Sequence, residues 1–251
     1  MSALRKLLSF APQGFKDAVR QQMAKVLGVA YPRHGLPGEL VSSIGSNRAL
    51  SVVDVGAHAG AFSAGIEQLC GMRRAVLCEP NPEKAASLRR RFAGTNYEIF
   101  QGAICAHDGE AEFHVASFDA ISSLMPILGS SPDLGALDTS TKATIKVEAK
   151  TLDSLLGGIN FGPVDLLKID VQGAELLVLQ GSGKVLAQTA RIWVEVSLKP
   201  LYEGSALFPE VYQFLIERGF GLQAVDPGYR SPNGELLQLD LLFLPFDRAG
   251  R

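Results

Sequence analysis

The sequence has few cysteines, a small net charge and no long apolar run. Its three cysteines, Cys70, Cys78 and Cys105, form no CxxC pair and have no metal-like spacing with histidine, so neither a disulfide framework nor a zinc site is expected. Cys78 lies within an apolar run and is expected to be a buried structural thiol. The net charge of -2 gives no overall reason to expect nucleic acid as a partner.

No apolar stretch reaches the roughly 20 residues that a membrane-spanning helix needs. The start of the chain also lacks a signal-peptide core and cleavage site, so we expect a cytoplasmic protein. Hydrophobic residues make up 47% of the sequence and charged residues 20%, which is typical of a folded globular chain and too apolar for a disordered one. A length of 251 residues allows one well-buried α/β domain with some accessory structure.

The first 34 residues differ in charge from the rest of the chain. Their apolar positions have roughly helical spacing, and Pro12 and Gly14 should divide them into two helices. They carry one acidic residue, Asp17, and six basic ones: Arg5, Lys6, Lys16, Arg20, Lys25 and Arg33. Such a segment can contact a membrane surface or a partner, or pack on the main domain with its charges in solvent. Prolines and glycines at 32–38 indicate a linker or lid, so we predict an N-terminal helical segment and linker at 1–38 and the main domain at 39–251.

From residue 50 onward, strand and helix patterns alternate. Strands are predicted at 50–55, 75–78, 97–100, 164–169, 192–196, 220–224 and 236–244, and helices at 59–69, 82–92, from 173 onward and at 208–218. An insert at about 112–149 holds two antiparallel strands around a long loop at 117–140, of the kind that is usually functional or mobile. The alternation predicts a doubly wound, Rossmann-like α/β sheet that binds its ligand beyond the carboxyl ends of the strands. The last strand is expected to be antiparallel, because no helix precedes it.

The most informative segment, at 52–62, reads as strand, acid, glycine turn and helix. Gly56 permits a sharp turn and close backbone approach, and Gly60 should let the helix lie against the strand. Backbone N–H groups at the start of that helix are expected to face the ligand. Glu79 ends the next strand about 20 residues later, where a carboxylate can accept hydrogen bonds from adjacent ribose hydroxyls.

A dinucleotide is the competing ligand for this turn. The GxGxxG pattern requires glycine where this chain has His58, and Asp54 would place a negative charge beside a pyrophosphate. S-adenosylmethionine has no phosphate, and its sulfonium and ammonium groups favour nearby carboxylates. The residues therefore favour the methyl donor. A nicotinamide-dependent oxidoreductase and a non-catalytic docking module remain as alternatives.

Four segments together resemble the FkbM family of methyltransferases: VVDVGAHAGAF (52–62), CEPNP (78–82), VEAKTLDSLL (147–156) and DLLKIDVQGAELLVLQG (165–181). The resemblance implies S-adenosylmethionine-dependent transfer to a hydroxyl oxygen of a sugar, glycolipid or other natural product. It further implies that Asp54, Gly56, Gly60 and Glu79 hold the donor and that the turn at 102–104, with Ala103, lies against the adenine. The predicted donor site is completed by Ala57, His58, Phe62, Pro80 and Asn81. The family's usual glutamate is replaced here by Gln172, to which we assign no role.

Asp170 ends the strand at 164–169 and is expected to point into the cleft beside the donor methyl group. A carboxylate there is costly unless it is paired or used. An alcohol is a poor nucleophile until its proton is removed, which makes Asp170 the candidate general base. Glu175, in the next helix, is either catalytic or stabilises the helix N-terminus. His58 is a reserve base or only shapes the loop, and His114 is a second reserve.

A divalent ion held by Asp170, Glu195 and Asp240 is an alternative way to activate the hydroxyl. We do not favour it and assign no metal ligands. The loop at 117–140 is expected to close over the acceptor, and Tyr202 and Phe208 to line its pocket, with Trp193 in the core.

Overall fold

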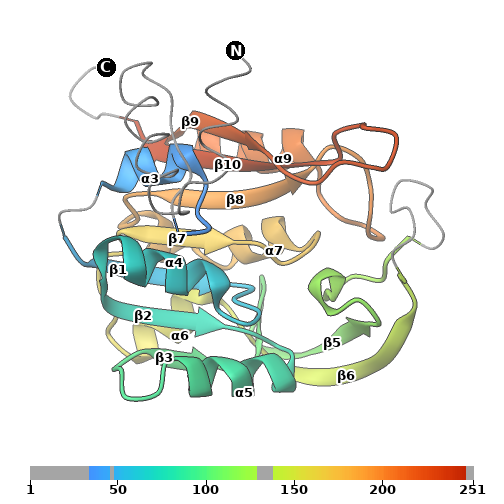
Figure 1. Cartoon of the computed structure of the whole chain (residues 1–251), viewed down its shortest axis with the longest axis horizontal. Coiled ribbons are helices and arrows are strands. Elements are labelled where there is room, and N and C mark those ends of the chain that lie inside the picture. The colour runs from blue at the N-terminus through green and yellow to red at the C-terminus, as the bar shows by residue number, and fades with distance from the viewer. Residues whose placement is uncertain (1–33, 46–47, 129–137, 247–251) are drawn as a thin grey trace, which may run out of the picture.

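The computed structural model describes residues 34–45, 48–128 and 138–246 (Figure 1). The predicted N-terminal helices and their basic residues up to Arg33 lie outside the described residues, as does the middle of the long insert loop. In the described part of the chain, no helix is both long and apolar enough to span a membrane.

The core of the fold is a seven-stranded sheet with the order β3-β2-β1-β7-β8-β10-β9. Its strands are β1 (Leu50–Val55), β2 (Met72–Cys78), β3 (Glu98–Phe100), β7 (Leu166–Ile169), β8 (Ile192–Ser197), β9 (Phe220–Pro227) and β10 (Gln238–Pro245). Neighbouring strands pair in parallel, except that β10 lies antiparallel between β8 and β9. This arrangement confirms the predicted doubly wound sheet with an antiparallel last strand.

Helices cover both faces because the buried strands present apolar side chains on both sides. One apolar cluster joins Val52, Leu77 and Leu166 to the first three helices, and the other joins Val53, Val55 and Ile169 to the later four. The first group comprises α3 (Gly38–Ile44), α4 (Ala61–Cys70) and α5 (Pro82–Arg91). The second comprises α6 (Leu152–Gly158), α7 (Glu175–Gln180), α8 (Gly183–Leu186) and α9 (Phe208–Glu217).

The described end of the segment predicted as a linker, residues 34–38, is folded against the domain. Leu36 and Leu40 are fully buried in the cluster that contains α4. Gly65 in α4 allows this contact, since a Cβ there would lie 2.7 Å from the carbonyl oxygen of His34. The prolines and glycines of 32–38 suggested a loop, but burial of the two leucines attaches the end of this segment to the sheet.

The insert forms a small second sheet in the order β4-β6-β5. Its strands are β4 (Ala103–Ile104), β5 (Gly109–Ala116) and β6 (Thr141–Lys150). As predicted, β5 and β6 are antiparallel, with His114 opposite Thr144. The β5–β6 pair reaches past the carboxyl end of β2, and the short 3-10 helix η1 (Asp119–Ile121) lies at the same edge of the main sheet (Figure 1).

Candidate functional site

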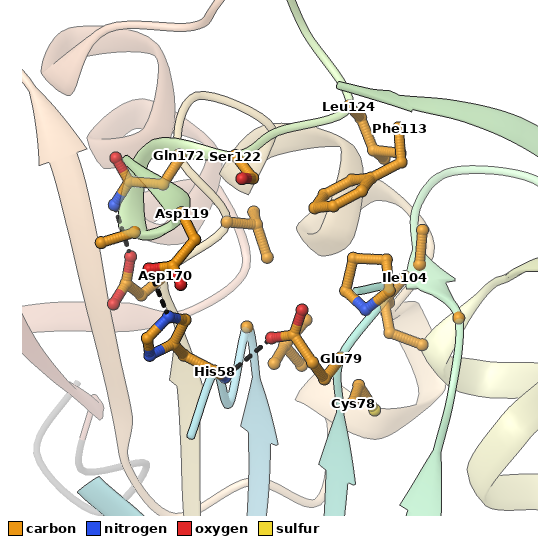
Figure 2. Close-up of a pocket in the computed structure, with 17 residues that line it drawn as sticks. His58, Cys78, Glu79, Ile104, Phe113, Asp119, Ser122, Leu124, Asp170 and Gln172 are labelled. Carbon is orange, nitrogen blue, oxygen red and sulfur yellow. Dashed lines mark hydrogen bonds and ion pairs between the residues drawn. The ribbon is translucent and has the colours of Figure 1, made fainter. Parts of the chain in front are cut away.

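Two cavities lie at the carboxyl ends of the central strands, and both are lined by Gly56, His58 and Asp170. The first, of about 210 Å³, is otherwise bounded mainly by the end of β2, the turn at 102–104 and the insert. Figure 2 shows its lining residues. The second, of about 280 Å³, is also lined by Pro37, Ala57, Ala61, Phe62, Lys168, Trp193, Glu195 and Asp240. The three shared residues therefore stand where the two cavities meet.

Gly56 has a φ of 77°, and a Cβ there would overlap the carbonyl oxygen of Asp170 and lie 2.8 Å from its carbonyl carbon. The predicted close backbone approach is therefore made to the chain that leaves β7. Gly60 was expected to pack against the strand, and that expectation is wrong. A Cβ on Gly60 would instead lie 2.8 Å from both Leu88 and Phe92, so Gly60 allows the start of α4 to approach α5 and its C-cap.

The Glu79 carboxylate, which lines the first cavity, is held by two backbone donors. Its Oε2 accepts from the N–H of His58 at 2.7 Å, and its Oε1 accepts from the N–H of Asn81 at 2.9 Å. Burial raises the pKa of Glu79, and the two N–H groups act in the opposite direction. Each carboxylate oxygen still has a lone pair, so Glu79 can accept from two adjacent hydroxyls of a ligand.

Most N–H groups of the glycine loop are already used within the protein. Those of Gly56 and Ala57 both donate to the carbonyl oxygen of Cys78 at 3.0 Å, and that of Gly60 donates to Ala57 at 2.8 Å. His58 donates to Glu79, as described above. These four groups are therefore not available to a ligand, and the expectation that N–H groups at the start of α4 face the ligand stays a prediction. A pyrophosphate would find none of the four free, and it would meet the carboxylate of Glu79.

The opposite end of the first cavity is apolar. Ala103, Ile104, Phe113 and Leu124 line it, together with Gly102 (Figure 2). Phe113 and Leu124 come from the insert, so the small second sheet contributes a wall that the sequence analysis did not foresee. The turn at 102–104 lines this cavity, and its contact with the adenine stays a prediction. Such a surface suits a flat aromatic base. Pro80 also lines this cavity, whereas Asn81 caps α5 by accepting from the N–H of Glu83 at 3.0 Å.

Asp54 is fully buried and lines neither cavity. Its Oδ2 accepts from the hydroxyl of Ser63 at 2.6 Å, and its Oδ1 lies 3.2 Å from the Nζ of Lys168. Lys168 also donates to the carbonyl oxygen of Gly56 at 2.6 Å and lies 3.3 Å from Asp170. Burial alone would lower the pKa of Lys168, but the charges of Asp170 and Asp54 outweigh it and the net direction is upward.

The sequence analysis missed Lys168, although a signal was present. A lysine between Leu167 and Ile169 in an apolar strand is rarely fully buried unless it is paired. The pairing of Lys168 with Asp54 also bears on the expectation that the charge of Asp54 disfavours a pyrophosphate. The charge of Asp54 is balanced within the protein, so Asp54 itself is no reason to exclude a phosphate ligand. The carboxylate of Glu79, which lines the first cavity, supplies that reason instead.

Asp170 has a side chain that is 36% exposed and lines both cavities. Its Oδ1 accepts from the amide Nε2 of Gln172 at 2.8 Å, and the same nitrogen donates to Glu195 at 2.8 Å. Burial raises the pKa of Glu195, to which the charges of Asp170 and Asp240 add, and burial raises the pKa of Asp240 to about 7. Asp170, Glu195 and Asp240 thus surround the second cavity, as the metal alternative requires. Among the described residues, however, no group of three or more His, Cys, Asp or Glu is arranged to hold a metal ion.

Glu175 is buried behind the loop that follows β7 and lines neither cavity. Burial raises its pKa to about 7, against hydrogen bonds donated by the N–H groups of Gly173 and Val171. Of the two histidines, His58 lines both cavities, whereas His114 bonds to Thr144 on the insert and lines neither.

The three aromatic residues considered for the acceptor pocket lie in different places. Trp193 is buried and also forms a wall of the second cavity. Phe208 packs on the ring of Tyr212, and Tyr202 lines neither cavity. Tyr202 reaches the site through Gln172, whose Oε1 accepts from its hydroxyl at 2.9 Å.

The described part of the insert loop covers the first cavity. The Oδ1 of Asp119 in η1 lies 3.1 Å from the Nε2 of His58 (Figure 2). Asp119 also forms an ion pair with Lys84 of α5. The hydroxyl of Tyr202 lies 3.1 Å from the carbonyl oxygen of Ile121. The loop was expected to close over the acceptor. Four of its described residues, Asp119, Ala120, Ser122 and Leu124, form a roof over the cavity that contains Glu79, and closure over the acceptor stays a prediction.

A parallel sheet with one antiparallel strand, and a carboxylate poised for two hydroxyls beside a glycine turn, define the Rossmann-like methyltransferase class of fold. Residues 54–222 match the model of the methyltransferase FkbM domain, and the chain belongs to this family. The chain is 28% identical over 159 residues to 2-O-methyltransferase NoeI of Sinorhizobium fredii. That match covers 61% of this chain and 65% of the relative.

Two solved structures share the fold. Methyltransferase FkbM of Methylobacillus flagellatus is similar with a TM-score of 0.50 and 15% identity, over 80% of this chain and 45% of that one. A putative S-adenosylmethionine-dependent methyltransferase of Listeria monocytogenes is similar with a TM-score of 0.50 and 8% identity, over 83% of this chain and 97% of that one. This chain thus aligns with less than two thirds of the length of NoeI and of the Methylobacillus protein.

Proposed function

We propose that this protein is an S-adenosylmethionine-dependent methyltransferase that acts on a hydroxyl oxygen. The observation that carries the proposal is Glu79, which is held by two backbone N–H groups with its remaining lone pairs available at the first cavity. Membership of the FkbM family supports the reaction class. Support for oxygen as the acceptor atom comes from a relative that is named as a 2-O-methyltransferase.

The first cavity fits the nucleoside part of the donor. Glu79 would accept from the two ribose hydroxyls, and the apolar end at Ala103, Ile104 and Phe113 would hold the adenine. Four loop N–H groups already donate within the protein, and a pyrophosphate would meet the Glu79 carboxylate, which argues against the nicotinamide alternative. When bound, S-adenosylmethionine supplies an activated methyl group on a sulfonium sulfur.

The second cavity fits the acceptor. Asp170 is partly exposed at the junction of the two cavities, so it would take the proton of an acceptor hydroxyl that enters from the second one. Glu195 and Asp240 offer further oxygen acceptors there, and Phe62 and Trp193 offer aromatic walls. Carboxylates beside aromatic side chains suit a hydroxyl-rich, sugar-like molecule. Alignment of the hydroxyl with the donor would supply much of the rate enhancement, because good positioning alone is worth ~7–11 kcal/mol.

Calorimetric titration with S-adenosylhomocysteine tests the donor site. Glu79→Gln keeps the shape of the side chain but replaces one acceptor oxygen with an NH₂ group. We expect the affinity to fall about 10- to 100-fold, as for the loss of one charge-assisted hydrogen bond. Glu83→Gln is the matched control, since it makes the same change on α5 outside both cavities, and it should bind normally. Normal binding by Glu79→Gln, or thermal stabilisation by NAD and none by S-adenosylhomocysteine, would refute the proposal.

Turnover against a panel of sugars, glycolipids and polyketide alcohols tests the reaction, with a chelator arm for metal dependence. In Asp170→Asn we expect donor affinity to be retained and turnover to fall about 10²- to 10⁴-fold, the range for loss of a general base. Unchanged turnover in Asp170→Asn would remove Asp170 from the chemistry and leave the donor site intact.

A further inference from the structure

We propose that Gln172 is a positioning residue that holds the Asp170 carboxylate in place between the two cavities by donating a hydrogen bond to it. The inference rests on the proposed function, in which Asp170 accepts a proton. It concerns a residue to which the sequence analysis assigned no role.

The Gln172 amide joins three side chains from different parts of the fold. Its Nε2 donates to Oδ1 of Asp170 and to Oε2 of Glu195, each at 2.8 Å, and its Oε1 accepts from the hydroxyl of Tyr202 at 2.9 Å. This orientation satisfies all three contacts, because the amide nitrogen donates to carboxyl oxygens and the amide oxygen accepts from the hydroxyl. Both amide protons are thus directed at the two carboxylates.

The backbone at this residue is itself constrained. Gln172 has a φ of 56°, in the left-handed region that a residue with a side chain seldom adopts. Its carbonyl oxygen accepts from the hydroxyl of Ser123 at 2.7 Å, and Gly173 follows with a φ of 100°. A Cβ on Gly173 would lie 3.0 Å from the Tyr202 ring, so the chain must pass close to this ring. The backbone of Gln172 is fixed in a costly conformation, and hydrogen bonds hold both its carbonyl oxygen and its side-chain amide. A residue fixed in this way is well suited to a positioning role.

Charge explains why an amide is needed here. Asp170 and Glu195 approach the same nitrogen, and two carboxylates at that spacing repel each other unless a donor lies between them. The ionisable groups that interact with Asp170 include Lys168 of β7, Glu175 of α7, Glu195 of β8, Asp240 of β10 and Tyr202, and His58 lines the same two cavities. Lys168 is the basic side chain paired with Asp170 in this set, and it is shared with Asp54. The amide supplies the second donor.

¹³C NMR of protein labelled at aspartate carboxyl carbons tests the proposal, with the Asp170 signal assigned by its loss in Asp170→Asn. In Gln172→Met, which keeps the length of the side chain but removes both donors, protonation of Asp170 should move to higher pH by about one unit. Gln172→Glu should move it further, because the new carboxylate adds like charge. Near-ultraviolet circular dichroism shows that each variant is folded, and Gln172→Glu serves if Gln172→Met is not.

Gln238→Met is the matched control. Gln238 donates to the same oxygen of Glu195 at 2.7 Å but makes no hydrogen bond to Asp170. Loss of this donor should not change the pH at which Asp170 becomes protonated. A shift in Gln238→Met as large as that in Gln172→Met, or no shift in either Gln172 variant, would overturn the proposal. Failure of the proposed function is seen separately, as absence of S-adenosylhomocysteine binding by the unsubstituted protein.

Discussion

Replacement of Lys168 by methionine provides the sharpest test of how the glycine loop is held. The ammonium group lies 3.2 Å from Asp54 and 3.3 Å from Asp170, and it donates to the carbonyl oxygen of Gly56. Lys168 and Asp54 are both buried. Methionine has a similar length and no charge, so the substitution removes these interactions with little change in packing.

The magnitude follows from burial. At 3.2 Å and an effective dielectric constant of about 20, each charge pair contributes about 5 kcal/mol of attraction before the cost of desolvation is subtracted. Removing one partner of a buried pair leaves the other charge uncompensated and typically costs about 3–5 kcal/mol. We therefore expect Lys168→Met to lower the free energy of unfolding by that amount. The melting temperature should fall by roughly 6–20 °C.

Urea unfolding measures this loss, and a double-mutant cycle identifies its cause. The double variant Lys168→Met/Asp54→Asn should recover most of the stability, because replacing a buried pair with neutral groups is often close to neutral. A loss of less than about 1 kcal/mol in the single variant, as for an exposed pair, would refute the buried-charge argument. Equal losses in the single and double variants would assign the effect to packing.

Four further predictions concern the loop, the acidic cluster, the roof and the N-terminus. Gly56→Ala should abolish S-adenosylhomocysteine binding in calorimetry and cost about 2–5 kcal/mol in urea unfolding, because the new Cβ overlaps a backbone oxygen at a positive φ; normal binding would contradict the loop geometry. Asp240 has a pKa raised to about 7, so its folded form holds a proton more tightly than its unfolded form, and stability falls as pH rises from about 4 to 7. Asp240→Asn should remove this loss, and its stability relative to the unsubstituted protein, measured by urea unfolding, should be higher at pH 8 than at pH 5; equal differences would count against it. Asp119→Ala should speed S-adenosylhomocysteine release in stopped flow by up to about fivefold, as for loss of a partly exposed ion pair, and an unchanged rate would mean that this contact does not hold the roof. If the basic N-terminal segment docks on membranes, deletion of residues 1–34 should remove salt-dependent sedimentation with anionic vesicles, and a full-length chain that does not sediment would exclude electrostatic docking.

Local sequence patterns were sufficient for much of the fold. The strand at 50–55 has the predicted bounds, because a β-branched apolar run that ends at glycine leaves little freedom. Asn81 caps α5 with proline at its first position, again as predicted, because both preferences act over a few residues. Helix α3 and the packing of Leu36 depend on a distant surface of α4, and no local signal indicates them.

The candidate site was likewise predictable from the sequence only in part. The spacing of Gly56 and Glu79 along two adjacent parallel strands was sufficient to place them together, because the carboxyl ends of such strands meet at one edge of the sheet. Asp54 shows where this reasoning stops. An acid before a glycine turn resembles a ligand-binding residue in sequence, but its side chain points to the face that α4 covers and pairs with Lys168.

The order of residues along the chain thus determined the type of sheet, the glycine turn and the presence of an acid at the end of β2, since each depends on neighbours within a few positions or on strand periodicity. Only the tertiary structure decided which carboxylates face a cavity and which are neutralised by a buried lysine. It also brought Gln172, Glu195 and Tyr202 into one hydrogen-bonded group. Those contacts join segments up to 30 residues apart in sequence, and they depend on how the elements pack.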